Sequence, residues 1–281
     1  MAMAERHMAA RFNSEGKEII DHFTYVMCGD GDLMEGVSME AASLAGHLGL
    51  SRLICMYDDN SISIEGATDL AFTEDVKLKF ESMNWQVIEV VDGNDLEAIY
   101  NAIDTARSET EKPSMIKLKT EIAYGSPSKQ GSAGAHGAPL GEEEVRKVKE
   151  FFNFPPDKNF YVPDEALQER ERIIEKGETL EGEWQERFNA FKKEAPGLAD
   201  LFVDAVSGSL TQGWDKDIPV FSPSDDPVAT RAASGKVINA IAPNLPVLMG
   251  GSADLAPSNK TYIEGESDFG KGSYHGRNIR F

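Results

Sequence analysis

The chain of 281 residues is long enough for one large or two ordinary domains with a buried core. Its formal charge of −20, from 48 acidic and 28 basic residues, argues against non-specific binding to nucleic acid or to an anionic membrane. No run approaches the roughly 18 apolar residues of a membrane span, and the first residues lack the pattern of a signal peptide. Two cysteines, Cys28 and Cys55, are too few for a disulfide framework, so we expect buried thiols in a cytoplasmic protein.

Strand-like and helix-like segments alternate through the first 120 residues. Ser38 is expected to cap the first of these helices, and Gly49 to end it. The expected elements, in chain order, are a strand at 23–28, a helix at 38–49, strands at 53–57 and 85–91 separated by a helix at 72–83, a helix at 96–108 and a strand at 114–119. This alternation predicts an α/β fold with a doubly wound parallel sheet.

The second half begins with a Gly/Ser-rich loop, 125–141, and continues into a charged helical region at about 142–202. A second β–α pattern starts at Pro227, with a helix to about Ile241 and a strand at 246–250. The run 277–281 resembles the start of a strand or a turn. We therefore expect three parts: a first domain at 1–206 that lacks its N-terminal portion, a linker at 207–226, and the truncated beginning of a second, similar α/β domain at 227–281.

Two oxygen-bearing side chains follow two neighbouring strands. Asp30 lies within Gly29-Asp30-Gly31 after the first strand, and Asn60 follows the second. Ligands bind beyond the carboxyl ends of strands in such sheets, and magnesium prefers oxygen ligands that it shares with phosphate groups. We expect Asp30, Asn60 and the carbonyl of Ile62 to hold a divalent cation, while Gly31 lets the backbone approach a diphosphate.

These two segments closely resemble the cofactor-binding segment of transketolases. The order and spacing of further segments agree over nearly the whole chain, and the match is poorest around 165–206; the matching segments are 120–127, 136–141, 227–231 and 250–259. The resemblance implies a transferase of the pentose phosphate pathway, which moves a two-carbon ketol unit from a ketose phosphate to an aldose phosphate. It also implies thiamine diphosphate with Mg²⁺ (or Ca²⁺ or Mn²⁺) as cofactors, and a homodimer with the active site between subunits.

The resemblance also assigns roles to single residues. His136 resembles a histidine that touches both cofactor and substrate, and neutral imidazole suits proton transfer near pH 7. Arg231 and Ser258 look like the pair that grips the sugar phosphate, and Asp254 resembles a carboxylate near the substrate. The remaining two, Glu35 and Glu40, match glutamates of a carboxylate network near the dimer interface and the cofactor.

In transketolases a glutamate that activates the cofactor lies shortly after the segment that 278–281 resembles, and a Gly-rich cofactor loop precedes the segment that opens here. We therefore expect little turnover from these 281 residues alone. Dihydroxyacetone synthase shares the same motifs. Deoxyxylulose-phosphate synthase shares the Gly-Asp-Gly and Asn elements, but fits 136–141 and the Arg231/Ser258 pair less well. A non-catalytic cofactor-binding or dimerisation module is the alternative outside the enzymes.

Overall fold

The structure, a computed structural model, describes residues 1–224 and 226–280. These fall into two compact units, which we call the sheet unit (residues 2 and 22–175) and the terminal unit (residues 1, 3–21 and 176–281). The expected linker at 207–226 and the expected strand start at 277–281 each contain one residue outside the described ones, Asp225 and Phe281. The expected domain boundaries stay a prediction. No helix among the described residues has both the length and the apolar character to cross a bilayer.

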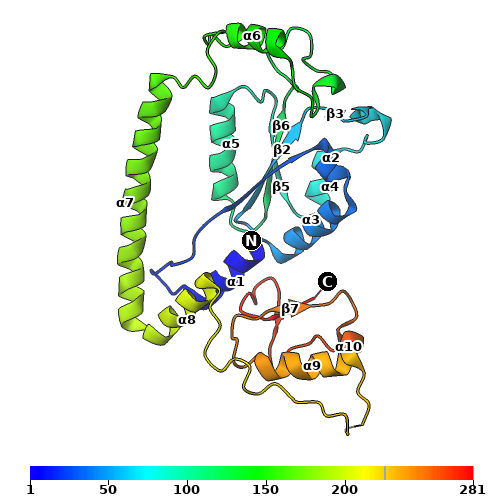
Figure 1. Ribbon diagram of the computed structural model, residues 1–281, viewed down its shortest axis with the longest axis vertical. Coiled ribbons are helices and arrows are strands. Elements are labelled where there is room, and N and C mark those ends of the chain that lie inside the picture. The colour runs from blue at the N-terminus through cyan, green and yellow to red at the C-terminus, as the bar shows by residue number, and fades with distance from the viewer. Residues whose placement is uncertain (225, 281) are drawn as a thin grey trace. The chain divides into compact units, whose positions relative to one another are not determined.

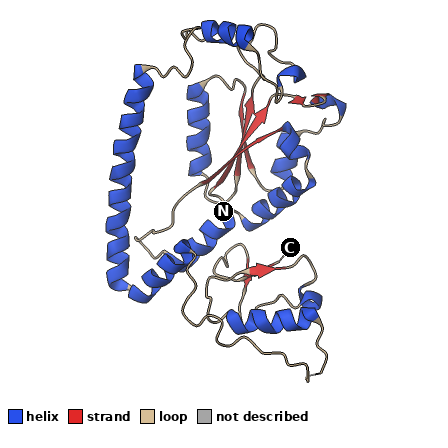
Figure 2. Cartoon of the chain, viewed as in Figure 1, coloured by secondary structure: helices blue, strands red, loops and turns tan. Residues whose placement is uncertain are grey.

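Four parallel strands form the centre of the sheet unit, in the order β1-β2-β6-β5. Their bounds are Thr24–Gly29 for β1, Leu53–Asp59 for β2, Ser114–Lys119 for β6 and Gln86–Val90 for β5. Helix α5 (Leu96–Ser108) covers one face, and α3 (Gly36–Leu48) and α4 (Val76–Ser82) lie on the other (Figures 1 and 2). The predicted α/β fold with a parallel sheet is confirmed.

Burial explains the apolar residues in the middle of the two central strands. Ile54 of β2 and Met115 and Ile116 of β6 are completely buried, as expected for parallel strands with helices on both faces. Helix α3 lies close to the backbone at Met83, because Gly46 of this helix has no side chain. The indole of Trp85 donates a hydrogen bond of 2.8 Å to the carbonyl of Ala42 on the same helix.

Two of the expected helix starts are wrong. Helix α3 begins at Gly36, and the hydroxyl of Ser38, inside its first turn, donates to the carbonyl of Asp32 at 2.6 Å. The helix expected at 72–83 is shorter, because the side chain of Asp75 accepts from the N–H of Leu78 and starts α4 at Val76. The expected end at Gly49 is confirmed by its left-handed backbone, with φ of 62°.

The carboxyl edge of the sheet carries short elements that sequence patterns did not indicate. They are α2 (Asp30–Met34), the β3–β4 hairpin (Ile62–Ser63 with Gly66–Ala67) and a 3-10 turn at Thr68–Leu70. The loop after β6, with a second 3-10 turn at Ala133–Ala135, leads to α6 (Glu142–Phe151) at this same end of the sheet (Figure 1). The region expected to be helical contains α6, α7 (Asp164–Glu194) and α8 (Pro196–Ser207).

An aromatic cluster forms the main core of the terminal unit. Phe12 of α1 (Ala2–Phe12) packs edge-on against Phe202 of α8, with ring centroids 5.4 Å apart. Phe188 and Phe191, from the end of α7, complete the cluster with Ile19. The indole of Trp184 stacks on Phe188 and donates to the carbonyl of Ile19. The charged region therefore ends in an apolar core.

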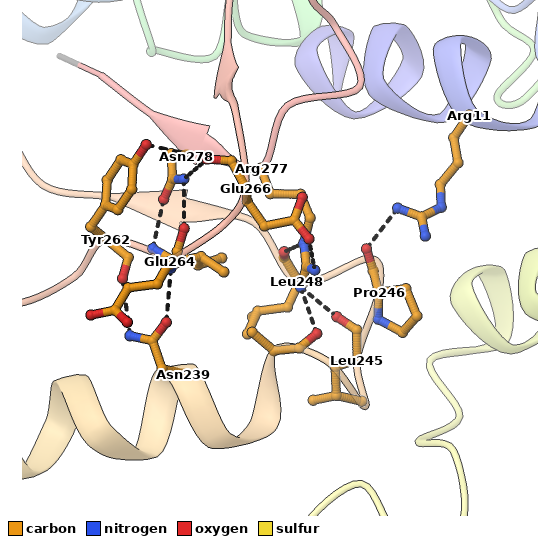
Figure 3. Close-up of polar contacts among 12 residues, drawn as sticks. Arg11, Asn239, Leu245, Pro246, Leu248, Tyr262, Glu264, Glu266, Arg277 and Asn278 are labelled. Atoms are coloured by element: carbon orange, nitrogen blue, oxygen red, sulfur yellow. Dashed lines mark hydrogen bonds and ion pairs between the residues drawn. The ribbon is translucent and has the colours of Figure 1, made fainter.

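The C-terminal part of the terminal unit has α9 (Thr230–Ile241), α10 (Ala256–Asn259) and a small parallel sheet in the order β7-β9-β8; the strands are β7 (Gly250–Gly251), β9 (Asn278–Ile279) and β8 (Asp268–Phe269). The strand expected at 246–250 is therefore wrong over most of its length. The chain from Ala242 to Leu248 curls around the buried guanidinium of Arg277, which donates to the carbonyls of Ala242, Leu245 and Leu248 and pairs with Glu266 at 2.9 Å (Figure 3). An extended chain could not bring the carbonyls of Ala242, Leu245 and Leu248 to one guanidinium.

Candidate functional site

Asp30 is the centre of the candidate site in the sheet unit. It follows the last residue of β1, and it is only 3 % exposed. The hydroxyl of Tyr57, a buried residue of β2, donates to Oδ1 of Asp30 at 2.6 Å, and the backbone N–H of Ser61 donates to Oδ2 at 3.1 Å. Burial and, after it, the bond to Asp30 raise the pKa of Tyr57, so the phenol keeps the proton that it donates. These two bonds fix the plane of the carboxylate.

The carboxylate of Asp30 has no cationic partner within residues 1–224 and 226–280. A buried charge is costly unless it is paired or coordinates a metal, and each carboxylate oxygen keeps a free lone pair after accepting one hydrogen bond. The surroundings of Asp30 therefore fit a bound cation. In the part of the chain that the structure describes, no group of three or more His, Cys, Asp or Glu side chains could hold a metal ion, so amide and carbonyl oxygens would have to complete the ligand set.

Asn60 and Ile62 supply oxygens of this kind in the next turn of chain. The amide of Asn60 donates from Nδ2 to Asp58 at 3.2 Å, and its Oδ1 accepts the N–H of Ile62 at 3.0 Å. The hydrogen bond from Ser61, which lies between the two residues, ties this loop to Asp30. The structure thus brings together Asp30 with Asn60 and Ile62, the three residues expected to hold a cation, and carboxylate, amide and carbonyl oxygens suit Mg²⁺ or Ca²⁺.

Two clefts flank the loop. One, of about 540 Å³, is lined by Asp30, Tyr57, Thr68 and Lys117 among others. The second, of about 610 Å³, has Asn60, Ile62 and Lys119 in its wall. Space for a ligand is therefore present beside Asp30 and beside the loop that bears Asn60 and Ile62.

The sequence analysis missed the polar residues that hold the ends of β2 and β6 together. Lys117 pairs with Asp59 at 2.7 Å, and Lys119 reaches both Asp59 at 3.3 Å and the hydroxyl of Ser61 at 2.8 Å. The hydroxyl of Thr120 donates to Asp58. The spacing of Lys117 and Lys119 indicates that they share one face of a strand, because they lie two positions apart. Nothing in the sequence shows that β6 pairs with β2, so the acidic partners of these lysines could not be predicted.

The remaining expected cofactor residues nearby are exposed. Gly31 lies in α2, and a Cβ added there would meet no heavy atom within 4 Å, so a ligand has space to lie against this backbone. Glu35 and Glu40 lie just before and within α3, with exposed side chains that form no hydrogen bond or ion pair with other described residues of the sheet unit. Their expected role at a subunit interface stays a prediction.

His136 follows the 3-10 turn of the long loop, and its side chain is exposed. The loop is anchored at its base: the carboxylate of Glu144 accepts from the hydroxyl of Ser126 at 2.6 Å and from the N–H of Ser128 at 2.8 Å. These bonds, led by that of Ser126, lower the pKa of Glu144 to about 2. The loop that carries His136 therefore starts from a fixed point on α6.

The three residues expected to bind the sugar phosphate belong to the terminal unit. Arg231 is the second residue of α9 and Ser258 lies in α10; both side chains are exposed. Asp254 has a left-handed backbone, with φ of 48°. The two helices are in close contact, because a Cβ on Gly235 of α9 would come within 2.7 Å of Lys260. Within the described residues the guanidinium of Arg231 forms no ion pair, so it stays available to an anion.

The two cysteines are free thiols, as expected. Their sulfur atoms lie 3.4 Å apart between β1 and β2. Cys28 pairs in register with Tyr57 and Cys55 with Val26, so the two residues are diagonal neighbours. The hydrogen bond to Cys55 and, after it, burial raise the pKa of Cys28, which keeps its thiol protonated and unreactive.

The chain is similar to known proteins both in sequence and in structure. Residues 1–211 match the family model described as transketolase, thiamine diphosphate binding domain. The chain is 49 % identical to a transketolase of Geobacillus stearothermophilus and 50 % identical to one of Nostoc sp., and in both cases all of the chain matches 42 % of the relative. The crystal structure of a Pichia stipitis transketolase in complex with sedoheptulose-7-phosphate superposes with a TM-score of 0.95 at 43 % identity, over 99 % of this chain and 42 % of that one.

Proposed function

The chain belongs to the transketolase family, and we propose that it carries the diphosphate- and metal-binding half of an enzyme that transfers two-carbon ketol units between sugar phosphates. It spans 42 % of the length of the curated relatives that it matches. One observation carries the proposal: the buried carboxylate of Asp30, without a cationic partner in the described part of the chain, is tied to the loop that bears Asn60 and Ile62. This arrangement fits a divalent cation that in turn binds a diphosphate.

Each residue has a defined task in this proposal. Asp30, Asn60 and the carbonyl of Ile62 hold Mg²⁺ (Ca²⁺ or Mn²⁺ would also suit these oxygens), and the backbone at Gly31 contacts the diphosphate of thiamine diphosphate. When bound, thiamine diphosphate supplies the nucleophile and electron sink that make and break the carbon–carbon bond. His136 moves a proton at the reacting substrate.

Residues of the terminal unit orient the substrate. Arg231 presents a fork of donors that suits a phosphate, and Ser258 adds a hydroxyl. Asp254 contacts the substrate near these groups. Holding the phosphate far from the reacting carbon positions that carbon for reaction. The proposed substrates are accordingly a ketose phosphate and an aldose phosphate, as in the pentose phosphate pathway. We place the protein in the cytoplasm, as a homodimer with Glu35 and Glu40 near the subunit interface.

The metal and cofactor sites are tested by isothermal titration calorimetry of thiamine diphosphate with and without Mg²⁺. We expect binding that depends on Mg²⁺ and weakens at least tenfold in Asp30→Asn, because even the outer partners of metal ligands are worth about 10–100-fold in affinity. Asp69→Asn is the matched control, since it makes the same change of charge at an exposed residue of the sheet unit. Binding that ignores both Mg²⁺ and the Asp30→Asn change would contradict the proposal.

A further inference from the structure

Ser61 stands in a backbone conformation that serine rarely adopts. Its φ is 61°, in the left-handed region, where residues other than glycine are uncommon and persist only when their surroundings hold them. Ser61 lies between Asn60 and Ile62, so its conformation sets the relative positions of the amide oxygen of Asn60 and the carbonyl of Ile62.

Three hydrogen bonds hold Ser61, and each comes from a different segment. Its N–H donates to Asp30 at 3.1 Å, its carbonyl accepts the N–H of Thr68 at 3.0 Å, and its hydroxyl accepts from the ammonium of Lys119 at 2.8 Å. The first bond links the loop to a proposed metal ligand and the second closes the β3–β4 hairpin. Only the third bond involves the side chain of Ser61, so a substitution of Ser61 or Lys119 removes it and leaves every proposed metal ligand unchanged.

Lys119 is well placed to act on the loop. It is the last residue of β6 and pairs in register with Asp59, and its ammonium contacts that carboxylate at 3.3 Å as well as the hydroxyl of Ser61. Lys117 lies two residues earlier on the same face and pairs with the same Asp59 at 2.7 Å. Since no contact of Lys117 with Ser61 is present in the described sheet unit, the chain contains its own matched control.

We propose that Lys119 is a positioning residue for the cation site: through the hydroxyl of Ser61 it keeps the 60–62 loop in the conformation in which Asp30, Asn60 and Ile62 hold one cation. The inference rests on the proposed function. Lys119 does not touch the cation. Its charge is balanced by Asp59, and its effect on the ligands is transmitted by one hydrogen bond to the residue between two of them.

A purely electrostatic role of Lys119 predicts the opposite change in cation affinity. If Lys119 acted only through its positive charge, removing it would strengthen the binding of a cation, because like charges repel. Ser61→Ala separates the two effects, because it removes the hydroxyl and leaves every charge in place. Alanine tolerates the left-handed region no better than serine does, so the change does not relax the loop in another way.

The test measures Mn²⁺ affinity by electron paramagnetic resonance at saturating thiamine diphosphate, in the unaltered protein and four variants: Ser61→Ala, Lys119→Met, both together, and Lys117→Met. We expect Kd to rise about tenfold in each of the first two, the size typical of an outer partner of a metal ligand. The double variant should be no worse than either single one, since both changes remove the same bond. Lys117→Met should not raise Kd, because Lys117 forms no bond with Ser61 in the described sheet unit and its loss removes a positive charge from the cleft that Asp30 lines.

Thermal unfolding of the same variants without metal separates positioning from general stability. Lys119→Met and Lys117→Met should lower the melting temperature to a similar extent, and only the former should weaken Mn²⁺ binding. If Ser61→Ala binds Mn²⁺ as tightly as the unaltered protein does, or if the two single effects add, the inference is wrong while the proposed function stands. If the unaltered protein binds no Mn²⁺ with thiamine diphosphate, the proposed function fails and the inference fails with it.

Discussion

Tyr57→Phe removes one oxygen atom from the centre of the site and changes nothing else in the shape of the side chain. The hydroxyl is buried and donates to Oδ1 of Asp30 at 2.6 Å. Hydrogen bonds to charged groups contribute about 1.5–3 kcal/mol to stability, and a buried acceptor that loses its donor pays the full cost of its desolvation. We therefore expect the free energy of unfolding to fall by about 2 kcal/mol, a large part of the roughly 5–15 kcal/mol typical of a folded protein.

Urea unfolding followed by circular dichroism measures this loss. The matched control is Tyr124→Phe, because Tyr124 is 40 % exposed and its hydroxyl forms no hydrogen bond within the described residues. That change should stay within about 0.5 kcal/mol, as for most surface substitutions. The dependence of the free energy on urea should keep its slope in both variants, since neither alters the surface exposed on unfolding.

The result that would refute the reasoning is a Tyr57→Phe protein as stable as the Tyr124→Phe control. The carboxylate of Asp30 would then not depend on the phenol, and the description of a buried charge held by two neutral donors would be wrong. Adding Mg²⁺ with thiamine diphosphate gives a second check. A bound cation compensates the charge of Asp30 directly, so the deficit of Tyr57→Phe should shrink when both are present.

Three further results are expected. Gly46→Ala should cost at least about 1–3 kcal/mol, because the new Cβ would come within 1.8 Å of the carbonyl of Met83, whereas Gly36→Ala on the same helix meets nothing within 4 Å and should be neutral or stabilising in urea unfolding. The pKa of Glu144 is about 2, against an ordinary 4.5, so its ionised carboxylate stabilises the fold above pH 4.5. This contribution to stability should be lost as the pH falls toward about 2. In an acid titration Ser126→Ala should lose less stability than the unaltered protein. A coupled assay should detect little ketol transfer by the 281-residue chain alone.

Much of the sheet unit could be predicted from the sequence because its helices and strands alternate regularly and its central strands, β2 and β6, carry buried apolar residues. The run 53–57 contains no charged residue, and the helix at 96–108 was predicted with its observed bounds. The errors lie where one side chain decides the outcome. Asp75 shortens α4, and Arg277 curls the chain from Ala242 to Leu248 around its guanidinium, which prevents most of the strand expected at 246–250. Periodicity contains no information about such long-range bonds.

In the candidate site, too, some residues could be predicted from the sequence and others could not. Asp30 and Asn60 could be predicted to lie together, because the carboxyl ends of parallel strands meet at one edge, and Gly29 and Asp58 are indeed register partners. The residues that hold Asp30 and Asn60 in place could not be predicted. Tyr57 looks like an ordinary core aromatic, and the role of Lys119 depends on the pairing of β6 with β2, which brings together residues 58 positions apart in the sequence.

Three carboxylates follow one another around this edge of the sheet, and each is compensated differently. Asp58 is exposed to water and accepts from two neutral groups. Asp59 lies between two ammonium groups, those of Lys117 and Lys119. Asp30 is the most buried of these three, yet it receives only two neutral hydrogen bonds from the described residues. Since burial makes an uncompensated charge costly, a cation is expected at Asp30, and the lysines that neutralise Asp59 leave Asp30 as the carboxylate on which that cation would bind.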